Sequence, residues 1–224
     1  MRRCSSLDVR TIRGAQAGRR AFILANGPSV AKEDLSKLKG ELVIGMNAST
    51  LLEKEHGFDT QYYVLSDVRF ISHETKRAWG TSDLDKATVR ILRSELRDVD
   101  DRELLARTAY VDAIGRDGFS ANLTNGFYYG CTTTMLAIQA AFYLDCSEIN
   151  LLGVDLRYAA DAPRFYEEAT PQVEDAYTSV QISNIIAAKD FCAKRGVHLN
   201  NCSERSFLRP YLGYRSFDSF FTEA

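Results

Sequence analysis

Three features are missing from this sequence, and each absence excludes a class of protein. No run of apolar residues approaches the roughly 20 that cross a bilayer, so we expect no membrane-spanning helix. The first residues, MRRCSSLDVRTIRG, carry charges but lack the apolar segment of a secretory signal. The cysteines form no Cys-x-x-Cys pair, which predicts reduced and mostly buried thiols in a cytoplasmic protein.

A strong charge of one sign is absent as well. The 28 basic and 30 acidic side chains give a net charge of −2, which argues against nucleic acid as the main partner. No Gly-x-Gly-x-x-Gly follows the first expected strand, which argues against a nicotinamide dehydrogenase. The 224 residues suffice for one α/β domain, or for one domain with a lid.

The segment from Gly126 to Tyr158 organises the rest of the chain. Its apolar residues from Met135 to Leu144 wrap most of one helix, and the mainly apolar stretch 148–153 is too short for another helix. A helix followed by a buried strand is the unit of a parallel sheet. Similar strands are expected at 21–25, 42–45, 61–65, 88–92, 108–111 and 197–200. The predicted fold class is therefore α/β with a mostly parallel sheet.

Polar residues follow four of these strands, at the edge where open α/β sheets bind ligands. A plain turn or a helix cap explains any one of them, but their repetition favours a ligand site. The residues are Asn26, Gly27, Pro28, Ser29, Asn47, Ser66, Asp67 and Asp155.

The start of the central helix suggests what such a ligand carries. Thr132, Thr133 and Thr134 stand there, after Gly130. Unpaired backbone N–H groups and hydroxyls at a helix start can hold an anionic group such as a phosphate.

The remaining segments predict how the chain is divided. Residues 1–19 are basic and poor in apolar side chains, so we expect a flexible leader. Residues 20–208 form the expected body. The segment 209–224 mixes arginines with aromatic residues, and we expect it to pack on the body or on another subunit of a homo-oligomer. Peripheral contact with the inner face of a membrane is the alternative.

A lid is expected at about 156–176, directly after Asp155. The segment is acidic and aromatic with weak periodicity, and it carries Tyr158 and Tyr166. An ordinary surface excursion is the alternative.

Several of these motifs occur in a recognisable order. Together they resemble the superfamily that holds the family 42 sialyltransferases, the motility accessory factor glycosyltransferases and the proteins similar to 6-hydroxymethylpterin diphosphokinase. The resemblance covers about Ala21 to Leu208. It implies a Rossmann-like, doubly wound transferase domain with helices on both faces, which binds a nucleotide-linked donor without a metal ion. The motifs are the turn at 23–29, Asn47, Ser66-Asp67, GCTTT at 130–134 and LLGVD at 151–155.

The resemblance also implies roles for particular residues. In the sialyltransferases the corresponding residues hold the cytidine monophosphate part of the donor, and lid tyrosines hold the phosphate. By position, the tyrosines correspond to Tyr158 and Tyr166. The nucleotide-binding residues correspond to Asn26, Gly27, Ser29, Asn47, Thr132, Thr133 and Thr134.

The sequence departs from the sialyltransferases at the residue that acts as general base. Those sialyltransferases use a histidine between the lid and the last helix, whereas this sequence has no histidine between His73 and His198. Proton transfer would fall to His73 or to a carboxylate. The candidate carboxylates are Asp67, Asp155 and Glu167.

The first functional hypothesis is a metal-independent, inverting glycosyltransferase that makes bacterial surface carbohydrate such as lipopolysaccharide or capsule. Its donor would be a CMP-linked nonulosonate or a related sugar acid, with Arg157 or Arg164 pairing the donor carboxylate, and its acceptor a carbohydrate. One alternative is a pterin diphosphokinase-like pyrophosphoryl transferase that holds Mg²⁺ on Asp67, Asp155 and Asp161. The other is a non-catalytic module that binds a nucleotide sugar.

Overall fold

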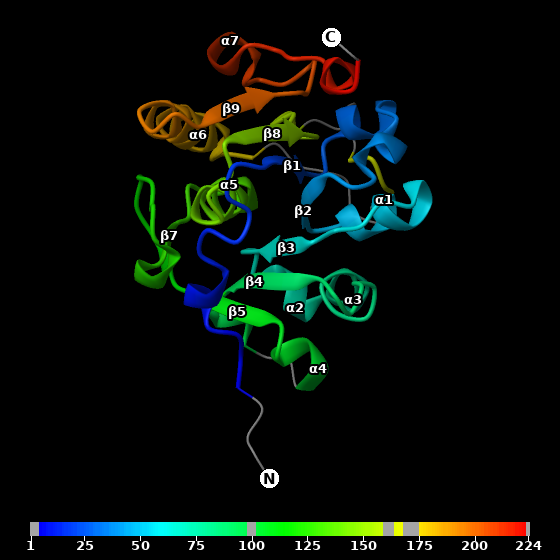
Figure 1. Cartoon of the computed structure of the whole chain (residues 1–224), viewed down its shortest axis with the longest axis vertical. Coiled ribbons are helices and arrows are strands. Elements are labelled where there is room, and N and C mark those ends of the chain that lie inside the picture. Colours follow the sequence, from blue (N-terminus) through cyan, green and yellow to red (C-terminus); the bar gives the residue numbers. More distant parts are fainter. Residues whose placement is uncertain (1–4, 98–101, 159–163, 168–174, 223–224) are drawn as a thin grey trace.

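The computed structural model describes residues 5–97, 102–158, 164–167 and 175–222 (Figure 1). Within them, one sheet has seven strands in the order β5-β4-β3-β2-β1-β8-β9, and every neighbouring pair is parallel. A short parallel pair, β6 (Ala113–Ile114) and β7 (Phe127–Tyr128), stands apart from it. The strands of the main sheet are β1 (Arg20–Leu24), β2 (Leu42–Met46), β3 (Tyr62–Leu65), β4 (Val89–Arg93), β5 (Thr108–Val111), β8 (Glu148–Leu152) and β9 (His198–Asn201).

Helices cover both faces of this sheet, as expected for a doubly wound fold. Figure 1 shows α5 and α6 on one face, with α1 and α3 on the other. Side chains alternate accordingly: Ile23 joins the core beneath α5, whereas Phe22 and Leu24 join a core on the opposite face. The helices are α1 (Ser49–His56), α2 (Arg69–Ser72), α3 (Glu74–Trp79), α4 (Arg102–Leu105), α5 (Thr133–Tyr143), α6 (Thr178–Ala193) and α7 (Arg209–Leu212).

The order of the strands reverses beside β1. The chain proceeds from β1 outward through β2 to β5 and then returns to β8 on the other side of β1. The carboxyl ends of β1 and β8 therefore flank a switch point, where open α/β sheets form their ligand crevice.

The composition of the turn at 26–29 predicts that a helix opens after it, over residues 31–38, but the structure has no α-helix there. Two 3-10 turns replace it, η2 (Pro28–Lys32) and η3 (Leu35–Leu38), because the backbone at Glu33 is extended (φ −92°, ψ 145°) and interrupts the helix. Val30 and Leu35 are buried on either side of the break. The turn that follows β1 therefore opens no long helix.

Part of the expected leader packs on the body of the protein. A 3-10 turn, η1 (Val9–Ile12), buries both of its apolar ends in the core beneath α5. Backbone N–H groups of Gly14 and Gln16 then donate to carbonyls at the end of α5, at 3.0 and 2.9 Å. Two apolar side chains and these backbone bonds are enough to dock a segment whose composition is mostly polar.

The aromatic segment near the C-terminus packs on the body. Phe217 and Phe220 are buried in η6 (Phe217–Phe220), and their rings meet the ring of Phe22 edge-on at 5.6 and 5.3 Å. Arg20 of β1 also donates to the Phe220 carbonyl at 3.0 Å. None of the helices in the described ranges is both long enough and apolar enough to cross a membrane.

Candidate functional site

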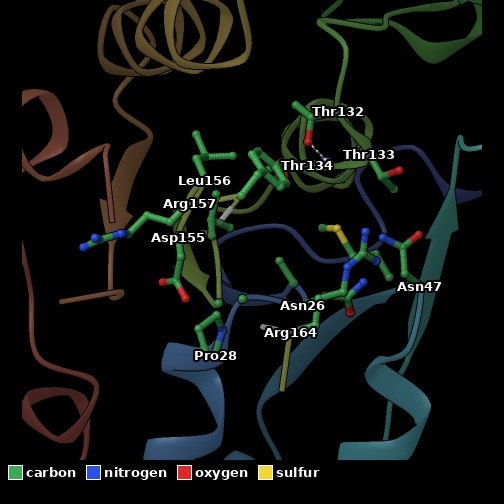
Figure 2. Close-up of a pocket in the computed structure, with 16 residues that line it drawn as sticks. Asn26, Pro28, Asn47, Thr132, Thr133, Thr134, Asp155, Leu156, Arg157 and Arg164 are labelled. Atoms are coloured by element: carbon green, nitrogen blue, oxygen red, sulfur yellow. Dashed lines mark hydrogen bonds between the residues drawn. The ribbon is translucent and has the colours of Figure 1, made fainter. Parts of the chain in front are cut away.

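A pocket opens where β1, β2 and β8 end and α5 begins (Figure 2). Its volume is about 550 Å³ including the solvent-open mouth. The sequence-predicted residues that line it are Asn26, Gly27, Pro28, Asn47, Thr132, Thr133, Thr134, Asp155, Arg157, Tyr158 and Arg164.

The turn after β1 is clamped to the end of β8. The Gly27 N–H donates to the Gly153 carbonyl at 2.7 Å. Asp155, only 3 % exposed, accepts from the Ser29 backbone N–H at 2.9 Å and from the Ser29 hydroxyl at 2.5 Å. Its carboxylate points toward the turn that carries Pro28 (Figure 2). Because both oxygens of Asp155 accept from Ser29, the geometry favours a role in holding the turn over a role in proton transfer.

The first turn of α5 forms another wall of the pocket. Thr132 is the N-cap, and its hydroxyl accepts from the Thr134 N–H at 3.3 Å. Thr133 shares a hydrogen bond of 2.9 Å with the Ser66 hydroxyl, which fixes α5 to the end of β3. Ser66 therefore acts behind the pocket rather than in its lining. Thr132, Thr133 and Thr134 place the start of this 11-residue helix in the pocket lining, where the positive end of the helix dipole favours an anionic ligand.

Two asparagine side chains in the pocket hold unsatisfied oxygens. Within the described residues, neither Asn26 Oδ1 nor Asn47 Oδ1 has a hydrogen-bond partner, although both atoms are buried. Asn26 is only 8 % exposed. A buried acceptor without a donor costs about 1–3 kcal/mol, and a ligand that supplies amino or hydroxyl groups would remove that cost.

The backbone around the pocket is strained at residues other than glycine. Asn47, Cys131 and Leu156 have left-handed φ values of 51°, 57° and 53°. The Tyr63 hydroxyl stabilises the first of these by donating to the Asn47 carbonyl at 2.8 Å. Such conformations collect at ligand sites, and neither composition nor periodicity could have revealed them.

Tyr158 lines the pocket but its hydroxyl is already engaged. It donates to Gln181 Oε1 at 3.0 Å, and Gln181 Nε2 donates to the Cys131 carbonyl at 3.0 Å and to Asp175 at 2.8 Å. Sequence analysis missed Gln181. The available signal was a polar residue on the inward face of the amphipathic helix α6, where it is almost fully buried.

Burial raises the pKa of Tyr158 to about 12. Because the pKa in the folded state exceeds the ordinary value of 10.0, the stabilising contribution of Tyr158 is complete below pH 10 and is lost as the pH rises toward 12. We therefore expect the difference in unfolding free energy between wild type and Tyr158→Phe to shrink above pH 10. Urea unfolding at a series of pH values measures this difference, with the exposed Tyr177→Phe as control. A difference that grows with pH would contradict the assignment.

The fold of this chain is similar to that of a MAf glycosyltransferase from Magnetospirillum magneticum AMB-1. That structure matches 96 % of this chain with a TM-score of 0.61 and 16 % sequence identity. The match covers 38 % of the MAf chain, so this protein spans well under half of its length. No protein-family model and no curated protein sequence matches this chain. The expected Rossmann-like α/β fold is confirmed.

The remaining predicted residues lie outside the pocket lining. Gly130 (φ 53°) provides close packing, because a Cβ there would lie 2.7 Å from Met135 Cγ. His73 is exposed between α2 and α3, and Glu167 is exposed too. Tyr166 contacts the pocket indirectly, through Arg164. Asp161 lies outside the described residues.

Asp67 is likewise outside the lining and is paired. Its carboxylate accepts from the Arg69 side chain at 2.9 and 2.8 Å and from the Arg69 backbone at 3.0 Å. Burial raises the pKa of Asp67, but the hydrogen bonds from Arg69 outweigh it and hold the pKa below the ordinary value. In the described ranges, no three His, Cys, Asp or Glu side chains converge as a metal site requires.

Proposed function

We propose that this protein is a glycosyltransferase that binds the nucleotide part of an activated sugar in the pocket at the ends of β1, β2 and β8. The observation that carries the proposal is the buried, unsatisfied Oδ1 of Asn26, which lines the same pocket as the first turn of α5. The wall that contains Asn26 thus holds an acceptor that needs a hydrogen-bond donor from the ligand. The wall formed by the start of α5 favours an anion. The fold shared with a MAf glycosyltransferase supports this choice of reaction.

The charges of the pocket favour a phosphate-bearing donor with a further acidic group, such as a CMP-linked nonulosonate. Arg157 and Arg164 both belong to the lining, and the Arg164 side chain lies beside Asn26 and Asn47, whereas that of Arg157 extends away toward the Phe207 ring (Figure 2). The one carboxylate among the described lining residues, Asp155, is bound by Ser29. In the proposed reaction a carbohydrate hydroxyl displaces the nucleotide with inversion, and the N–H groups and hydroxyls at the start of α5 stabilise the leaving phosphate.

A second candidate is a module that binds a nucleotide sugar without turnover. It is favoured because two of the carboxylates expected to act as the general base already accept hydrogen bonds. Asp155 is bonded to Ser29, and Asp67 is bonded to Arg69. Within the described pocket lining no histidine stands in for them. Turnover is the property that separates this candidate from the transferase.

Nucleotide binding tests both candidates. Titration calorimetry in EDTA, with CMP, CDP, UDP, GDP, ATP and a pterin, should show binding of CMP. A ligand at about one hundred times its dissociation constant raises the unfolding free energy by roughly 2.7 kcal/mol, which thermal unfolding detects. We expect Asn26→Ala and Thr133→Ala each to weaken binding about tenfold. The matched controls, Asn125→Ala and Thr124→Ala, change exposed side chains outside the lining and should bind as wild type does.

Two outcomes would change the conclusion. Binding of ATP or a pterin that requires added Mg²⁺, with no binding of CMP, would overturn the proposal in favour of a pyrophosphoryl transferase. Binding of CMP with no transfer of sugar from CMP-linked sugar acids would favour the non-catalytic module.

A further inference from the structure

Arg164 reaches the pocket from a short segment, residues 164–167, that lies against the turn after β1. The Phe165 N–H donates to the Asn26 carbonyl at 3.3 Å, which places this segment beside the pocket wall. Arg164 itself is partly buried and lines the pocket. Figure 2 shows its side chain beside Asn26 and Asn47. A cation therefore lies beside the two asparagines whose amide oxygens are unsatisfied (Figure 2).

The direction of the Arg164 side chain is set by Tyr166, two residues further along the chain. Arg164 Nη1 donates to the Tyr166 hydroxyl at 2.8 Å, and the guanidinium carbon lies 5.8 Å from the centre of the Tyr166 ring. The Tyr166 ring packs edge-on against Trp79 at 5.0 Å and against Phe165 at 5.1 Å. The hydroxyl of Tyr166 thus faces the pocket cation while its ring contacts residues of the core.

Trp79 anchors this arrangement in the body of the protein. It is 7 % exposed at the end of α3 and belongs to the core on the α1 face. Its ring also contacts Phe70 at 5.9 Å. A continuous series of contacts therefore runs from the pocket through Arg164 and Tyr166 to a fixed indole.

We propose that Tyr166 is a positioning residue that holds the Arg164 guanidinium in the pocket to bind an anionic group of the ligand, and that Trp79 reports the occupancy of this site. The inference deepens the proposed function and rests on it for the nature of the ligand, an acidic nucleotide sugar. A guanidinium offers five donors in one plane, which suits a phosphate or a carboxylate when its orientation is fixed. Fixing that orientation before binding lowers the entropy lost when the ligand is held.

The sequence supplies an optical probe of this arrangement, because Trp79 is the single tryptophan. An anion bound by Arg164 changes the charge and position of the guanidinium, which is bonded to the Tyr166 hydroxyl. The Tyr166 ring in turn packs edge-on against the Trp79 indole. Titration with CMP, and separately with inorganic pyrophosphate, should therefore change the Trp79 emission. The midpoint should equal the dissociation constant measured by calorimetry.

Tyr166→Phe separates positioning from packing, because it keeps the ring against Trp79 and removes the hydroxyl bond. We expect it to weaken binding of either probe roughly three- to tenfold and to abolish most of the change in Trp79 emission. Arg164→Ala should weaken binding roughly ten- to a hundredfold. Tyr211→Phe, at an exposed tyrosine outside the lining, is the matched control and should retain both affinity and emission change. Thermal unfolding confirms that each variant is folded.

The outcomes distinguish this inference from the proposed function. If Tyr166→Phe is folded, binds as tightly as wild type and keeps the emission change, the positioning role is wrong while nucleotide binding stands. If pyrophosphate binds in a Tyr166-dependent way but no nucleotide does, the inference stands and the proposed function is wrong. A folded wild type that binds neither probe would overturn both.

Discussion

Gly27→Ala is expected to weaken nucleotide binding roughly a hundredfold. A Cβ at this position would lie 2.4 Å from Asp155 Oδ2 and 2.6 Å from the Gly153 carbonyl oxygen. Neither atom can withdraw easily, because one belongs to a buried, hydrogen-bonded carboxylate and the other to the backbone at the end of β8. The turn must move instead, and Asn26 moves with it. Overpacking of this kind costs about 1–3 kcal/mol, which corresponds to roughly five- to 150-fold in affinity.

Calorimetry with CMP measures the loss, and Gly115→Ala provides the matched control. A Cβ at Gly115 would meet no atom within 4 Å, and its φ is not left-handed. Wild-type affinity is expected for Gly115→Ala. Wild-type affinity in Gly27→Ala would mean that the turn after β1 takes no part in binding.

Asp155→Ala should lower the free energy of unfolding by about 3 kcal/mol and remove measurable nucleotide binding. Two hydrogen bonds from Ser29 to a charged acceptor are lost, and bonds of this type contribute about 1.5–3 kcal/mol each. The turn after β1 then loses its attachment to the segment after β8. Urea unfolding and calorimetry measure the two effects, with the exposed Asp59→Ala as control.

A double-mutant cycle decides whether Asp155 acts on structure or on the reaction. Ser29→Ala combined with Asp155→Ala should show a coupling free energy of about 1–2 kcal/mol, since each side chain is the partner of the other. A general base would behave differently. In that case Asp155→Ala would bind nucleotide and unfold as wild type does, while transfer to the acceptor would fall.

The sheet was predictable because its central strands, β1, β2, β3 and β8, are almost fully buried. Each residue of β2 is buried, and β8 is buried from its second residue onward, so both appear in the sequence as short apolar runs between polar turns. The same logic placed Asn26, Asn47 and Asp155 at one edge of the sheet, since parallel strands share the direction of their carboxyl ends. The pocket at that edge contains all three.

The orientation of these side chains was not predictable. Whether the Asp155 carboxylate faces the cavity or Ser29 depends on the approach of two strands more than 120 residues apart in the sequence. Gln181 acts through contacts with Tyr158 and Cys131, which are distant in the sequence, and Glu33 interrupts the helix expected over residues 31–38. The burial of Val9 and Ile12 likewise depends on core residues that only the folded body brings together.

The position of the pocket beside β1 also bears on how the chain folds. The pairing of Arg20–Leu24 with Glu148–Leu152 closes a loop of more than 120 residues, whereas β1 and β2 pair across a short connection. Such distant pairing carries a large entropic cost and tends to form late. The turn after β1 gains its attachment to Gly153 and Asp155 only when this pairing is complete. The wall of the pocket that this turn forms is therefore completed in the same event that joins β8 to the sheet.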